Sequence, residues 1–151
     1  MRLVVQRVRR ARVLVDGQPL AAIGPGLLIL CGVARNDTPA DAGFLARKCA
    51  QLRIFNDAEG RMNLGPRDVQ AQFLVVSQFT LYGDCAKGNR PSYIEAAPPE
   101  EGERGYELFV SELRAQVGEV QTGRFRAAML VELENDGPVT LLLESTGRVG
   151  P

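Results

Sequence analysis

The sequence predicts a single compact α/β domain in which two helices pack on one side of a sheet. Its length of 151 residues suits one domain, and its hydrophobic fraction of 45% is that of an ordinary globular protein. Several short segments are dominated by valine, leucine and isoleucine, which favours strands. Two longer segments repeat apolar residues at helical spacing instead. Many strands with two helices are typical of a mixed α/β domain.

The first half of the chain is predicted to alternate strands with tight turns. Four segments rich in valine and leucine are predicted as strands, over 3–8, 11–15, 20–23 and 27–33. Asp16-Gly17 marks a tight turn within this run. A helix is predicted from Pro39 to about residue 52, because Thr38 suits an N-cap and proline suits the first helical position. Arg53–Phe55 is predicted as a short strand.

The second half is predicted to hold a strand, a long ordered loop, a helix and two final strands, over 73–80, 82–99, 100–117, 127–133 and 139–143. The segment Glu134–Pro138 contains Asn, Asp, Gly and Pro in sequence, so it is predicted as the turn between the last two strands. The domain is expected to span residues 1–145, with a C-terminal tail over 146–151.

The composition excludes several kinds of site. The chain contains no histidine, so it has no Ser-His-Asp triad, no Cys-His dyad and no His-ligated zinc. The spacing of Cys31, Cys49 and Cys85 fits neither a disulfide framework nor a thiolate metal site. We expect Cys31 and Cys49 to be buried, whereas the neighbouring Asp84 disfavours a reactive thiolate at Cys85. We therefore expect no metal and no cofactor.

Charge and hydropathy bear on the partners of the protein. No apolar run approaches the ~20 residues of a membrane-spanning helix, so a cytoplasmic protein with no membrane partner is expected. The formal net charge is +0, yet residues 1–12 hold five arginines and no acid. Arginine suits phosphate, which favours a face that meets nucleic acid. A preference for arginine set by genomic base composition explains the same residues equally well.

Three polar stretches are candidates for chemistry. Ser77-Gln78-Phe79-Thr80 gathers two hydroxyls and an amide where a strand leaves the core, a common place for active sites. The alternative is a strand end whose polar groups bond a neighbouring loop. Asn135–Thr140 is typical of a turn, and the sequence does not choose the isomer of its Gly-Pro bond. Lys87–Tyr93 either contacts phosphate and sugar through its cations and aromatic ring or forms a solvated loop.

The motifs are more specific together than singly. They span 6–8, 11–13, 26–28, 53–55, 60–64, 74–81, 88–92, 122–125 and 135–140. With these stretches the sequence closely resembles the D-aminoacyl-tRNA deacylases. Ser77-Gln78-Phe79-Thr80 and Gly137-Pro138 match the two signature motifs of that family. The end of the chain after about Ser145 falls outside the resemblance.

The resemblance implies a homodimer with three layers, α/β/β, in which the sheets are mixed and mostly antiparallel and two main helices lie on one side. It implies an enzyme that hydrolyses the ester joining a D-amino acid, or mischarged glycine, to the terminal adenosine of tRNA. Gly137 and Pro138, joined by a cis bond, would bind substrate in the partner subunit's pocket and exclude L side chains by steric clash. The implied partners are aminoacyl-tRNA and a second copy of the chain, with no DNA.

The resemblance also places the four residues from Ser77 to Thr80 in the catalytic site. Backbone N–H groups near Phe79 and Thr80 would stabilise the oxyanion, while a ribose hydroxyl of the tRNA would assist proton transfer. Thr80 acts either through its hydroxyl or through its backbone N–H, and we prefer the second because no base lies near it in sequence. Phe125 and Met129 either line the substrate pocket or pack in the core.

Two positions depart from the pattern of the family. Many relatives carry glycine where this chain has Arg126, and an acidic residue often stands where it has Ala128.

Two other functions are compatible with the sequence. One is a non-catalytic dimeric module that binds the aminoacyl end of tRNA, and the other is a thiol hydrolase that uses Cys85.

Overall fold

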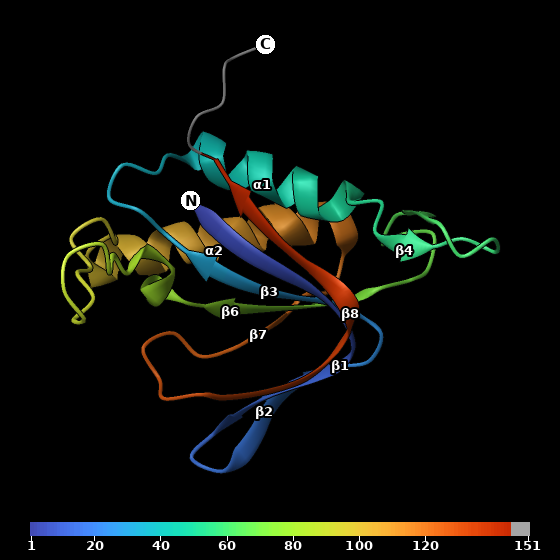
Figure 1. Ribbon diagram of the computed structural model, residues 1–151, viewed down its shortest axis with the longest axis horizontal. Helices are drawn as coiled ribbons and strands as arrows, with labels where there is room; N and C mark the ends of the chain where they lie inside the picture. Colours follow the sequence, from blue (N-terminus) through green and yellow to red (C-terminus); the bar gives the residue numbers. More distant parts are fainter. Residues whose placement is uncertain (146–151) are drawn as a thin grey trace.

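The longest antiparallel pairing in this protein joins β1 (Arg2–Val15) to β8 (Leu130–Glu144). The structure is a computed structural model that describes residues 1–145 (Figure 1), so the predicted tail over 146–151 lies outside the described residues. Between these strands the chain forms β2 (Gln18–Ile23), β3 (Gly26–Gly32), α1 (Pro39–Gln51), β4 (Phe55–Asn56), β5 (Met62–Leu64), β6 (Gln72–Ser77), the 3-10 helix η1 (Phe79–Tyr82), α2 (Pro99–Val117) and β7 (Gln121–Thr122). No helix in residues 1–145 is long and apolar enough to cross a membrane.

One mixed sheet contains most of the strands. Its order is β2-β1-β3-β6-β7, with β8 paired to β1. β1 is antiparallel to β2, β3 and β8, whereas β6 is parallel to β3 and β7. β4 and β5 form a separate antiparallel pair. The prediction of an α/β domain with a mixed sheet and two main helices is confirmed.

Two hydrophobic clusters lie on opposite faces of the central strands. Successive side chains of a strand point to opposite faces, so Leu27 and Leu28 of β3 belong to different clusters. Leu27 packs in the cluster that contains Leu45 of α1 and Phe109 of α2. Leu28 packs in the cluster that contains Val13 of β1 and side chains of β2. Figure 1 shows this arrangement, with both helices on one side of β3 and β6 and β2 on the other.

β1 contributes to both clusters because it bends along its length. Leu3 in its first half packs under the helices, and Val13 in its second half packs in the other cluster. The register against β8 shifts on both sides of Val8, and such an irregularity changes which face the following side chains point to. The predicted strands 3–8 and 11–15 are therefore one bent strand.

The last two predicted strands are also one strand, β8, and the predicted turn inside it is a bulge. Gln6 pairs with Thr140 and Val8 pairs with Asn135, so the residues around Gly137-Pro138 stand opposite Arg7 alone. β8 pairs only with β1 among the described strands, and a proline at a sheet edge removes no bond from the ladder. Turn residues thus interrupt the pairing without ending the strand.

The bounds of the other elements lie closer to their predicted positions. α1 begins at Pro39 as predicted, and the Asp41 carboxylate accepts hydrogen bonds from the Thr38 N–H (2.7 Å) and hydroxyl (2.6 Å). α2 begins at Pro99, one residue before the predicted start. The strand predicted over 73–80 ends at Ser77 because the chain turns there into η1. β5 and β7, with three and two residues, are too short to show a periodicity in sequence.

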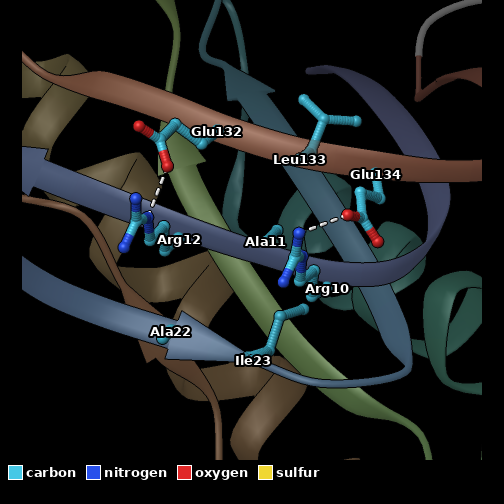
Figure 2. Close-up of a pocket in the computed structure, with 8 residues that line it drawn as sticks. All are labelled: Arg10, Ala11, Arg12, Ala22, Ile23, Glu132, Leu133 and Glu134. Atoms are coloured by element: carbon cyan, nitrogen blue, oxygen red, sulfur yellow. Dashed lines mark hydrogen bonds and ion pairs between the residues drawn. The ribbon is translucent and has the colours of Figure 1, made fainter.

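The arginines of β1 are paired with acidic residues of β8. The pairs are Arg2–Glu144, Arg7–Asp136, Arg9–Asp136, Arg10–Glu134 and Arg12–Glu132. Figure 2 shows two of these pairs side by side across the two strands. Because every arginine of the predicted basic stretch has a carboxylate partner, the structure favours a structural role for them over a face that meets nucleic acid.

Candidate active site

A cavity of about 740 Å³ opens where β6 leaves the sheet. Its walls come from the ends of β3 and β6, the start of α2 and the segment that leads into β8. Five residues predicted for the site line it, namely Ser77, Gln78, Phe79, Phe125 and Met129. The tertiary structure thus joins one signature stretch with residues about 50 positions later in the chain.

Phe125 is placed in the cavity wall by α2. Its ring centroid lies 6.0 Å from that of Tyr106, whose hydroxyl donates a hydrogen bond to the Val75 carbonyl (3.0 Å). Gly102, in the first turn of α2, lies beside the ring, and a Cβ there would make an ordinary contact of 3.7 Å with Phe125 Cζ. Phe125 therefore packs partly against the core and also lines the cavity.

Met129 is held by the backbone of the preceding turn. Its Sδ accepts a hydrogen bond from the Arg124 N–H (3.4 Å). A Cβ on Gly123 would lie 2.7 Å from the same sulfur, so a residue with a side chain at that position would displace Met129. Met129 packs against the second hydrophobic cluster while it lines the cavity.

The backbone at the start of η1 presents two N–H groups at this end of β6. The Gln78 N–H donates to the Cys31 carbonyl (2.8 Å), and the Leu81 N–H donates to the Gln78 carbonyl (3.2 Å). Between them, the N–H groups of Phe79 and Thr80 have no backbone acceptor in the described part of the chain. N–H groups with no acceptor of their own are suitable donors to an oxyanion.

Thr80 lies beside the cavity but does not line it. Its exposed hydroxyl accepts a hydrogen bond from Gln78 Nε2 (2.5 Å). No aspartate, glutamate or lysine side chain of residues 1–145 lines this cavity, so no strong base stands ready to activate that hydroxyl. The preferred role of the Thr80 backbone N–H stays a prediction.

The cysteines are poor candidates for a nucleophile. Cys31 lines the cavity, but its burial, with a smaller effect from nearby Cys49, raises the pKa of its thiol far above the ordinary range. Burial raises the pKa of Cys49 to about 12. Both are buried as predicted, and neither is a thiolate near neutral pH. Cys85 is exposed and does not line the cavity.

The second signature motif, Gly137-Pro138, lies outside this cavity. Gly137 and Pro138 are exposed, are joined by a cis peptide bond, and do not line the cavity of their own chain. Asn135 fixes the base of their loop, because its Nδ2 donates to the carbonyls of Arg7 (3.0 Å) and Val139 (3.1 Å). One chain therefore holds the two motifs at separate places.

Arg7 also anchors this loop, through contacts with Asp136, and the sequence analysis does not predict that role. Its side chain is 8% exposed and forms an ion pair with Asp136 at 2.9 Å. Its guanidinium also donates to the Asp136 carbonyl (3.1 Å) and to the Ile54 carbonyl (2.5 Å). The available signal was periodicity, since Arg7 falls on the same face of β1 as the buried Leu3 and Val5. A charged residue on a buried face requires partners, which here hold the loop.

The predicted loop over 82–99 is ordered by contacts at both ends. Asp84 and Ser92 exchange two backbone hydrogen bonds of 2.8 Å. The ring of Tyr93 lies edge-on to that of Phe79, with 5.1 Å between their centroids, and both residues line the cavity. Lys87 in the same loop is exposed and does not line the cavity.

Comparison with known proteins gives consistent matches. A profile of the family described as D-Tyr-tRNA(Tyr) deacylase matches residues 4–144. A D-aminoacyl-tRNA deacylase of Anaeromyxobacter dehalogenans is 58% identical over 145 residues, which are 96% of this chain and 97% of that protein. One from Heliobacterium modesticaldum is 54% identical over 147 residues, which are 97% of this chain and 98% of that protein.

Two solved structures are similar to this chain. One, described as a c-Myc DNA unwinding element binding protein, has a TM-score of 0.91 and 41% sequence identity, and the match covers 95% of this chain and 98% of that chain. The other, described as a probable eukaryotic D-amino acid tRNA deacylase, has a TM-score of 0.79 with the same coverage. Its sequence identity is 17%, so this likeness concerns the fold.

Proposed function

Because this chain belongs to the D-Tyr-tRNA(Tyr) deacylase family, we propose that it hydrolyses the ester bond of D-aminoacyl-tRNA and of glycine mischarged on tRNA. The observation that carries the proposal is the cavity beside β6. Its volume of about 740 Å³ lies within the range of small-molecule sites and suits a nucleoside ester. Phe79 lines the cavity, and the N–H groups of Phe79 and of the next residue, Thr80, have no backbone acceptor among residues 1–145.

In the proposed reaction, water attacks the ester carbonyl and negative charge develops on the carbonyl oxygen. The N–H groups of Phe79 and Thr80 stabilise that charge. The bond from the carbonyl carbon to the ribose oxygen then breaks, the ribose oxygen takes up a proton, and the free D-amino acid and the tRNA leave. The neighbouring ribose hydroxyl carries the proton, because the chain has no histidine and no carboxylate of the described residues lines the cavity.

Chiral selection is proposed to come from the loop of a second subunit. Gly137 and Pro138 are exposed and lie outside the cavity of their own chain, which leaves them available to the cavity of a partner. The anchors through Asn135 and Arg7 hold the loop in place. A rigid backbone there would bind the amino group of the substrate and clash with an L side chain, while a D side chain or glycine would avoid it.

Exposed apolar side chains along β8 support the proposed homodimer. Leu130 and Leu142 are 59% and 62% exposed, and Leu133 is 38% exposed. A hollow of about 450 Å³, shown in Figure 2, is lined by residues of β1, β2 and β8. Ile23 and Leu133 lie there beside the Arg–Glu pairs. Exposed apolar side chains grouped on one strand are typical of an interaction surface.

The decisive experiment uses the purified protein alone with matched D- and L-aminoacyl-tRNAs. We expect release of the D-amino acid and no measurable release of the L-amino acid. Replacing the terminal adenosine by its 2′-deoxy form is expected to slow D-ester hydrolysis by about 100-fold or more, because the assisting hydroxyl is lost. Binding of both tRNAs without turnover would favour a non-catalytic module instead.

The rate is expected to show no titration of a protein base. Histidine is absent, no carboxylate in the described chain lines the cavity, and the pKa of Cys31 is raised. The ratio of enzymatic to spontaneous hydrolysis of one D-aminoacyl-tRNA should therefore stay constant within about twofold between about pH 5 and 8. Taking the ratio cancels the effect of the substrate's amino group on the reactivity of the ester itself. An inflection in the ratio away from the pKa of that amino group would contradict the mechanism.

A further inference from the structure

The charge of the cavity is carried by two arginines. Arg35 and Arg126 are the ionisable side chains of fixed charge that line it, and no carboxylate of residues 1–145 stands among its walls. A cavity with cations and no anion attracts a ligand that carries negative charge. An aminoacyl group with its adenosine carries none, because its amino group is neutral or positive.

The two arginines differ in whether their guanidinium groups already have hydrogen-bond partners in the protein. Arg35 Nε donates a hydrogen bond to the Ile94 carbonyl (2.5 Å), so part of its guanidinium holds the loop before α2. Arg126 is exposed and has no hydrogen bond or ion pair within the described part of the chain. The arginines of β1, by contrast, all have carboxylate partners. Arg126 is therefore free to bind an anion at the cavity.

The backbone at Arg126 also has an unusual conformation. Its φ is +63°, in the left-handed region that disfavours residues with a side chain. The turn closes through the Ala127 N–H, which donates to the Arg124 carbonyl (3.3 Å). The neighbours Phe125 and Ala127 both line the cavity, so the turn presents Arg126 between two wall residues. A glycine would relax this backbone, whereas the chain carries a cation there.

We propose that Arg126 binds the phosphate that links the terminal adenosine of the substrate tRNA to the preceding nucleotide. The inference rests on the proposed function, which puts that adenosine in the cavity. The linking phosphate is then the nearest fixed negative charge of the substrate. A planar guanidinium matches two phosphate oxygens, so Arg126 would position the end of the RNA rather than take part in the chemistry.

The test compares two esters of the same D-amino acid, one on tRNA and one on free adenosine, which has no phosphate. We expect Arg126→Gly to lower kcat/KM for the tRNA ester by about tenfold more than for the adenosine ester, through KM. The slope of log kcat/KM against log salt should become shallower by about 0.7, the value for one lost contact to a single strand. Arg126→Lys should restore part of both effects, since it restores the charge.

Two controls separate charge from backbone and position. Arg126→Asn removes the cation but tolerates the left-handed backbone, so it should behave like Arg126→Gly. Arg124→Ala removes an exposed arginine two residues away that lines a different hollow, and it should leave the salt slope as in the wild type. An equal loss on both esters, or an unchanged salt slope in Arg126→Gly, would overturn the proposal.

The role of Arg126 can be tested even if the protein has no hydrolytic activity. A wild-type protein that hydrolyses neither ester would refute the enzyme. In that event, binding of a short single-stranded RNA ending in CCA, measured by fluorescence anisotropy, still decides the role of Arg126. Weaker binding by about tenfold in Arg126→Gly, with the shallower salt slope, would support the phosphate contact. Equal affinity of the two proteins would refute it.

Discussion

Gly137→Ala is expected to lower kcat/KM for D-aminoacyl-tRNA by about 100-fold, since a displacement of about 1 Å in a positioning group has that effect. A Cβ at this position would lie 2.6 Å from Asn135 Oδ1. The Asn135 amide is not free to move away, because its Nδ2 holds the carbonyls of Arg7 and Val139. Relief of the clash must therefore shift the loop that is proposed to enter the partner's cavity.

The variant is expected to fold normally, which separates this effect from instability. Gly137 is exposed and belongs to neither hydrophobic cluster, so the free energy of unfolding is expected to fall by only about 1 kcal/mol, as for a typical single substitution. Measuring kcat/KM and Tm on the same sample separates a loss of activity from a loss of stability. Full activity in Gly137→Ala would show that the loop does not position the substrate, and a large fall in Tm would assign it a structural role.

Mixing two inactive variants tests whether the loop serves the other subunit. Ser77→Phe would fill the cavity, and Gly137→Ala would leave the cavity intact but displace the loop. A heterodimer of the two holds one site with an intact cavity and an intact loop. Random mixing should then restore about a quarter of wild-type activity, because half of the dimers carry one good site of two. No recovery after the subunits have exchanged would place the loop in the site of its own chain.

Gly26→Ala is expected to destabilise the protein by about 3 kcal/mol, the upper end of the usual range for overpacking. Gly26 in β3 pairs with Gln72 in β6, and a Cβ there would lie 1.9 Å from the Gln72 carbonyl oxygen. The Gln72 backbone nitrogen and carbonyl carbon would both lie 2.7 Å away. These are backbone atoms of a strand between the two hydrophobic clusters, so they cannot move without separating the strands.

Thermal and urea unfolding measure this effect. A loss of 3 kcal/mol corresponds to a fall in Tm of at least about 6 °C for a domain of this size. Gly24→Ala is the matched control in the same turn, since a Cβ there would lie 3.6 Å from the Gln72 side-chain oxygen, an ordinary contact. A Gly26→Ala protein that melts within about 1 °C of the Gly24→Ala protein would refute the close approach of β3 and β6.

Local signals predicted several parts of the fold correctly. Thr38 and Pro39 placed the start of α1, because capping depends on a few adjacent residues. Apolar spacing predicted α2 to within one residue of its observed start. Alternating or continuous apolar residues predicted the central strands, since burial of a face produces that pattern wherever the strand lies.

Errors arose where a distant partner decides the structure. The residues around Gly137-Pro138 have the composition of a turn, yet β8 continues past them because β1 pairs with it on both sides. Arg7 belongs by sequence to the basic N-terminal stretch, but its burial and its contacts with the loop of β8 determine its role. Neither fact is encoded within a window of adjacent residues, because each depends on contacts more than 100 positions apart.

The candidate site divides in the same way. The residue types that are available follow from the sequence: it has no histidine for a triad, it has Ser77–Thr80 at the end of a strand, and it contains both motifs of the resemblance. Folding brings Phe125 and Met129 to that strand end and leaves Gly137-Pro138 apart from it. It also places Arg126 at the cavity without a partner among residues 1–145. The reason is physical. Residue chemistry is a local property, whereas a cavity and its charge arise from how β6, α2 and the segment before β8 pack around it.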